Sequence, residues 1–89
     1  MAGSVYFVTA LADPAAVRTR LDGFIPGDDL YELAADKWLV VFNGPAHDLA
    51  EQAGLRSIAP LGNGLVLPVT TYSGRAPSTL WDWLRAKGV

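Results

Sequence analysis

Two short segments of this chain are apolar on both of the faces that a β-strand presents. In Ser4–Leu11 (SVYFVTAL) and Trp38–Phe42 (WLVVF), successive residues would point to opposite sides of a sheet, and both alternating sets are apolar. A strand with one face in water would instead alternate apolar and polar residues. The two segments therefore predict two central strands in a sheet that is covered on both faces.

Two further segments predict the edge strands. Leu30–Ala34 leads into the second central segment through Ala35-Asp36-Lys37, a spacing typical of a β-hairpin. Leu65–Tyr72 contains Pro68, which has no N–H to donate to a neighbouring strand and so belongs at a sheet edge.

Three helices complete the predicted elements. The first begins at Asp13-Pro14, with the Asp side chain as N-cap and Pro at the first helical position. The second spans roughly residues 46–53. The third, LWDWLRAK, is predicted to be capped by Ser78 or Thr79.

This order of elements predicts an α+β fold, the ferredoxin-like βαββαβ arrangement with an extra C-terminal helix. Residues 1–89 are too few for two cores and form a single domain. The expected antiparallel sheet order is 4-1-3-2, with the first two helices on one face. The C-terminal helix and a second copy of the chain are expected to cover the other face together.

Composition favours self-association over binding of nucleic acid. The chain is 51% hydrophobic and 18% charged, below the typical charged share of about 25%. The net charge is −2 and the basic residues are scattered, so a phosphate-neutralising patch is not expected. The sequence shows neither a signal peptide nor a membrane span, which makes the cytoplasm the expected compartment. A homodimer with no membrane contact is predicted.

The titratable residues do not form a catalytic pattern. His47 and Glu51 share a helix face, but no third or fourth metal ligand is placed by spacing. Asp13 is assigned to helix capping, and Asp28, Asp29 and Asp36 lie in turns, where Asp is common. We expect no enzymatic activity, no catalytic residue, no metal and no cofactor.

Three aromatic residues and one loop are the candidate interaction sites. Trp81 and Trp83 are two residues apart on a helix, so we expect one to be buried and the other to lie partly exposed at an interface. The segment from Tyr72 to Arg75 carries hydroxyls, a glycine and an arginine before a helix, a combination that can bind an anion or simply cap the helix.

Trp38 is the third aromatic candidate. Together with Tyr6, Tyr31 and Phe42 it either packs in the core or a dimer interface, or forms a sheet surface that stacks RNA bases. The basic and glycine positions of RNA-recognition motifs are missing, and so is the glycine-rich, arginine-bearing loop that acylphosphatases carry after the first strand.

The frame VYFVTAL…KWLVVF…GLVLPVTTYSG…LWDWL resembles small bacterial ferredoxin-fold proteins related to the CRISPR-adaptation endonuclease and the virulence-associated protein D. The resemblance implies the fold and a tendency to pair through the sheet. Nuclease members carry an aspartate near the end of the first strand, where this chain has Val8-Thr9-Ala10-Leu11. The nuclease activity is therefore not implied.

We interpret the chain as a non-enzymatic protein-interaction module. It would act as a small dimer on an unidentified protein partner, as an inhibitor, immunity or accessory factor of a bacterium or phage. A divergent nuclease or RNA-binding protein of the same fold is one alternative. Binding of a small ligand at the loop from Tyr72 to Arg75 is the other.

Overall fold

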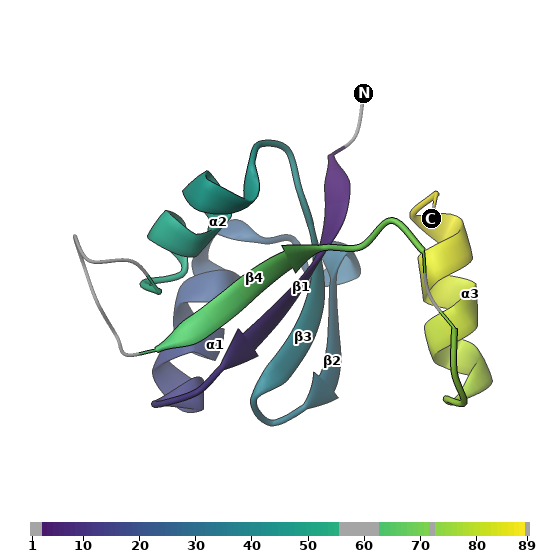
Figure 1. Cartoon of the computed structure of the whole chain (residues 1–89), viewed down its shortest axis with the longest axis horizontal. Helices are drawn as coiled ribbons and strands as arrows, with labels where there is room; N and C mark the ends of the chain where they lie inside the picture. The colour runs from purple at the N-terminus through teal and green to yellow at the C-terminus, as the bar shows by residue number, and fades with distance from the viewer. Residues whose placement is uncertain (1–2, 56–62, 72, 89) are drawn as a thin grey trace.

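The computed structural model describes residues 3–55, 63–71 and 73–88 of the 89-residue chain. Its elements follow the predicted order, with one additional 3₁₀ helix, η1 (Figure 1). In chain order they are β1 (Ser4–Ala10), α1 (Pro14–Phe24), η1 (Gly27–Asp29), β2 (Leu30–Ala34), β3 (Lys37–Phe42), α2 (Ala46–Gln52), β4 (Gly64–Pro68) and α3 (Ser78–Ala86).

The four strands form one antiparallel sheet in the order β2-β3-β1-β4. This confirms the predicted strand order and the central positions of β1 and β3. Phe7 of β1 fixes the register, because it lies opposite Leu39 of β3 on one side and Leu67 of β4 on the other.

β4 is shorter than predicted. It ends at Pro68, although the Val69 N–H makes one more bond to the Val5 carbonyl at 2.9 Å. The chain then leaves the sheet toward α3 (Figure 1). The predicted end of this strand, Tyr72, lies outside the described residues.

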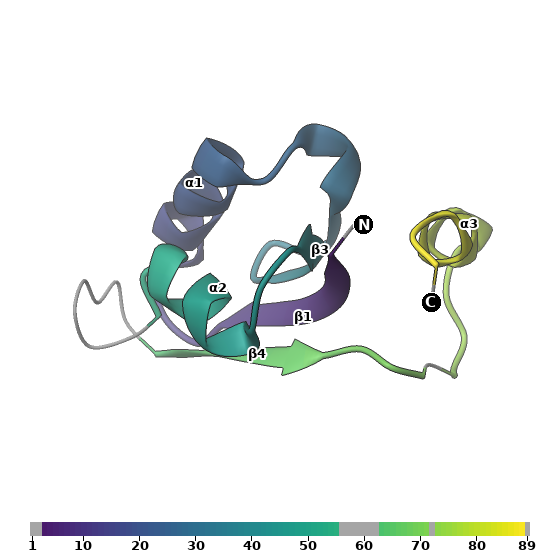
Figure 2. The same cartoon turned by 90° about the horizontal axis from the view of Figure 1, so that it is seen from above.

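α1 and α2 cover one face of the sheet, as predicted (Figure 2). Trp38 is fully buried at the centre of this layer, where its indole N–H points to the Glu32 carboxylate at 3.4 Å. The other buried residues of this first core are Tyr6, Val8, Ala10, Val17, Leu21, Ile25, Val40, Leu49 and Ala53.

α3 packs against the opposite face. Leu80 and Leu84 of this helix form a second buried cluster with Val5 and Leu39 of the central strands. The sheet is therefore apolar on both sides, as its central strands indicated. Among the described helices, none has the length and apolar character needed to cross a bilayer.

The predicted side-chain caps are wrong. Asp13 occupies the N-cap position of α1, but it adopts φ 49° and its side chain makes no capping hydrogen bond. Side-chain caps use an extended backbone at this position, which directs the carboxylate to the first free N–H groups. At α3 the N-cap is Pro77, and the Thr79 hydroxyl hydrogen-bonds the Tyr31 hydroxyl at 2.9 Å.

Candidate interaction surface

The second face of the sheet is covered over only part of its width. α3 lies over the β2–β3 side, where the Trp83 ring packs 5.8 Å from the Tyr31 ring. The Trp83 indole N–H donates to the Asp28 carbonyl at 3.1 Å. These contacts hold the helix against η1, and the cluster under α3 includes Val5 of β1 but no residue of β4.

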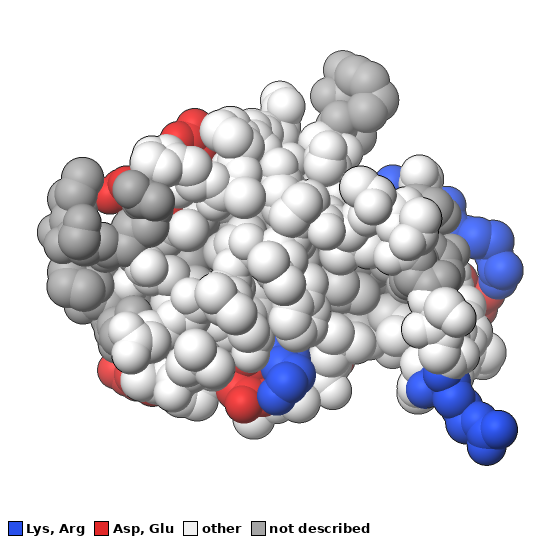
Figure 3. All heavy atoms as spheres, in the orientation of Figure 1, with Lys and Arg blue, Asp and Glu red and all other residues white. Residues whose placement is uncertain are grey.

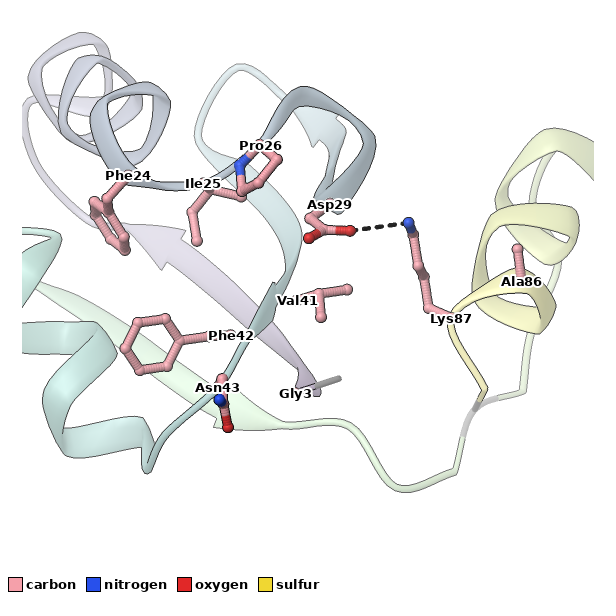
Figure 4. A pocket seen from close by; sticks show the side chains of 10 residues that line it. All are labelled: Gly3, Phe24, Ile25, Pro26, Asp29, Val41, Phe42, Asn43, Ala86 and Lys87. Carbon is pink, nitrogen blue, oxygen red and sulfur yellow. Dashed lines mark hydrogen bonds and ion pairs between the residues drawn. The ribbon is translucent and has the colours of Figure 1, made fainter. Parts of the chain in front are cut away.

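An ion pair holds the end of α3. The Lys87 ammonium lies 2.9 Å from the Asp29 carboxylate, and both side chains are mostly shielded from solvent. Beside this pair is a cavity of about 430 Å³, walled mainly by apolar residues from α1, β3 and α3 (Figure 4). Because Lys87 and Asp29 pair with each other, neither presents an unpaired charge to a ligand in this cavity. Their contact serves to hold α3 in place.

The uncovered part of the second face is lined by leucines. Leu65 and Leu67 of β4 are 51% and 48% exposed, and Leu33 of β2 is 38% exposed. Val66, between the first two, packs on the first core, so its neighbours point to the second face. Leu33 lies in β2, at the opposite edge of the sheet, so we call Leu65 and Leu67 the open strip.

Charge is scarce on this side of the molecule. Lys37 of β3 lies opposite Thr9 and carries a charge on the second face. Its ammonium donates to the neighbouring Asp36 carboxylate at 3.0 Å. Uncharged side chains cover the middle of the face shown in Figure 3, and the charged groups lie at its margin. The open strip is thus an apolar surface with a polar border, a pattern typical of association sites.

A groove of about 320 Å³ runs between the open strip and α3. Its floor includes Phe7 and Leu39, and Leu80 and Trp81 form the wall on the helix side. Arg75 lines the groove from the segment that joins β4 to α3.

Trp38, a candidate interaction residue, has no exposed surface. Its exposed fraction is 0%, because its side chain points into the layer between the sheet and α1. The aromatic residues proposed to stack RNA bases are therefore not exposed together. Tyr6 is buried on the same face as Trp38, and Phe42 packs edge-on against Phe24 on that face. Tyr31 is on the second face, under Trp83.

The two helix tryptophans differ from expectation. Trp81 and Trp83 are both half-buried, and both pack on the second cluster. At about 100° per residue they flank the stripe formed by Leu80 and Leu84, one on each side. Trp83 faces Tyr31 and η1, whereas Trp81 lines the groove. Of the predicted loop, Arg75 reaches the groove and Tyr72 lies outside the described residues.

The titratable residues are dispersed. His47 is exposed on α2. Within residues 3–55, 63–71 and 73–88, no three His, Cys, Asp or Glu residues are grouped so that they could hold a metal ion. On the outer side of α1, the hydrogen bond to the Asp22 carboxylate raises the pKa of Arg18, and the nearby Glu32 adds to this effect.

The open strip was missed at the sequence level. Leu65 and Leu67 lie two residues apart in the predicted edge strand and so share one of its faces, but the local pattern does not state whether that face is exposed. The signal that could have found them is the edge position that Pro68 imposes, because an edge strand is the first to extend beyond the cover of a single helix.

Comparisons with protein-family models, with curated proteins and with solved structures gave no match to this chain.

Proposed function

We propose that this chain is a non-enzymatic protein-interaction module of the ferredoxin-like fold, and that it pairs with a second copy of itself through the open strip. The observation that carries the proposal is the exposure of Leu65 and Leu67, about half of each side chain, on a face whose other half is already covered by α3. A second copy would continue that cover across the sheet.

Charge favours a second copy over an unlike partner. In a twofold-symmetric contact the same patch meets itself, so an uncharged patch needs no opposite charge on its partner. The open strip has none on its leucines, and Lys37 beside it is bonded to Asp36. An acidic or basic partner would find no complementary charge there.

The edge of the sheet is a less favourable place for pairing. Because the Val69 N–H bonds the Val5 carbonyl, alternate residues of β4 direct their backbone groups away from β1, namely Gly64, Val66 and Pro68. Pro68 has no N–H, so the outer edge lacks a donor there. Face-to-face packing avoids this gap.

The expected affinity is modest. Burying the exposed half of one leucine contributes about 1 kcal/mol, against an association cost of about 4–15 kcal/mol. The four leucines of a dimer thus contribute about 4 kcal/mol, which at best offsets this cost. A micromolar dimer therefore needs further contacts, in an interface of about 1,000 Å² in total.

Sedimentation equilibrium from about 1 μM to about 1 mM tests the proposal. The wild-type chain should change from a 9.5 kDa monomer to a dimer with rising concentration. Leu65→Gln combined with Leu67→Gln should remain monomeric. The matched control is Ala15→Gln with Thr19→Gln, on the exposed side of α1, which should dimerise as the wild type does. A wild-type mass of 9.5 kDa throughout would refute the proposal.

The proposal also includes an unidentified protein partner, a bacterial or phage origin, and a role as inhibitor, immunity or accessory factor. The alternatives are weaker. An RNA-binding protein of this fold would need exposed sheet aromatics, and Tyr6 and Trp38 are buried. At the end of β1, where nuclease relatives of the fold carry an aspartate, this chain has Thr9 and Ala10.

A further inference from the structure

Arg75 differs from the other lysines and arginines that the structure describes. Each of those donates to an acid or to a backbone carbonyl: Arg18 to Asp22 and Glu32, Arg20 to the Gln52 carbonyl, Lys37 to Asp36, Arg85 to Asp82 and Lys87 to Asp29. Arg75 is exposed and, among the described residues, takes part in neither a hydrogen bond nor an ion pair. Its guanidinium is therefore free to donate hydrogen bonds to an anion from outside the chain.

The surroundings of Arg75 are apolar on one side. The groove that it lines has Phe7, Leu39 and Leu80 on its floor and wall, and none of its described lining residues is acidic. Thr71 and Ser73, which carry hydroxyl groups, line it on the same segment as Arg75. One end of the groove thus offers a cation with neighbouring hydroxyls, and the rest offers hydrocarbon contact.

We propose that this groove binds a small amphiphile with one anionic head group, of the medium-chain carboxylate type. The guanidinium of Arg75 pairs with the carboxylate, for which its planar set of N–H groups is suited. The alkyl chain lies along Phe7, Leu39 and Leu80. A single arginine without an acidic neighbour matches one negative charge rather than a zwitterion or a dianion.

The size of the groove limits the chain length. Its volume of about 320 Å³ is near the lower end of the range for small-molecule sites, about 300–1,000 Å³. Each methylene that the groove buries should raise the affinity about fourfold. The gain should stop once the chain fills the groove, so the affinity should level off along the series hexanoate, octanoate and decanoate.

The test is a titration with octanoate below its micellar concentration. Calorimetry measures the affinity, and NMR shifts of the backbone amides locate the binding site. Octan-1-ol serves as the uncharged probe and octyltrimethylammonium as the cationic one. Octanoate should bind more tightly than either, with shifts at Phe7, Leu80 and Trp81. Arg75→Gln should weaken octanoate about tenfold and leave octanol unchanged.

Arg85→Gln is the matched control, because Arg85 is an exposed arginine of α3 that does not line the groove. It should change octanoate affinity by less than about twofold. Equal losses in the two variants would show a general charge effect and overturn the proposal. Equal binding of octanoate and octanol, shifts centred on Lys87, or no binding of octanoate would overturn it as well.

This proposal does not rest on self-pairing. Leu65 and Leu67 do not line the groove, so the Leu65→Gln, Leu67→Gln double variant should bind octanoate with the wild-type affinity. If the wild-type chain stays monomeric but binds octanoate through Arg75, the dimer is refuted and the ligand site is supported. If the chain dimerises but does not bind octanoate, the ligand site is refuted and the dimer is supported.

Discussion

The Lys87 ammonium contacts the Asp29 carboxylate across 58 residues of sequence, and this ion pair fixes the last turn of α3 to the 3₁₀ helix before β2. The same ammonium lies 5.7 Å from the centre of the Trp83 ring, whose indole N–H bonds the Asp28 carbonyl. One short segment, Asp28-Asp29, thus contacts α3 through two of its side chains, Trp83 and Lys87.

Lys87→Met should loosen α3, because it removes the charge while keeping an apolar stem of similar length. The pair is 21% and 31% exposed, and we expect a loss of about 1 kcal/mol in the free energy of unfolding. Urea denaturation followed by tryptophan fluorescence measures this loss, and the Trp83 emission should shift to the red. Arg85→Met breaks the largely exposed pair with Asp82 and should change neither signal.

Trp38→Ala should destabilise the fold by about 3–5 kcal/mol, because it empties the centre of the layer between the sheet and α1. Trp38→Phe retains part of the ring and should lose less. Thermal unfolding followed by circular dichroism measures both. An unchanged melting temperature in the alanine variant would contradict the buried position of this side chain.

Gly64→Ala and Gly23→Ala should have opposite effects. A Cβ at Gly64 would lie 2.7 Å from the Thr9 carbonyl oxygen, a backbone atom that cannot move without distorting the β1–β4 pair, and we expect a loss of about 1–3 kcal/mol. A Cβ at Gly23 meets nothing within 4 Å and lies in α1, where alanine is the better helix former by up to about 1 kcal/mol. Chemical denaturation of the two variants provides the comparison.

Pro68→Val should increase non-specific association. The new N–H would point to the outer edge of β4 and complete a row of backbone groups for another strand. Light scattering during incubation at raised temperature should rise faster than for the wild type. Pro68→Lys restores the same N–H but places a charge on the edge, and it should scatter less than the valine variant.

The sequence by itself determined the sheet. The two segments without a polar face became β1 and β3, and Pro68 confined β4 to an edge. Both predictions depend on local chemistry, namely the alternation of side chains along a strand and the missing N–H of proline.

Only the tertiary structure decided which face each residue would meet and how far α3 would extend across the sheet. The alternation in β3 divides its residues into two sets, but it does not state that Trp38 faces α1 while Leu39 faces α3. The position of α3 depends on contacts such as Trp83 with Asp28, which are 55 residues apart in the chain. Local pattern carries no information on such pairs, because they exist only once the chain has folded.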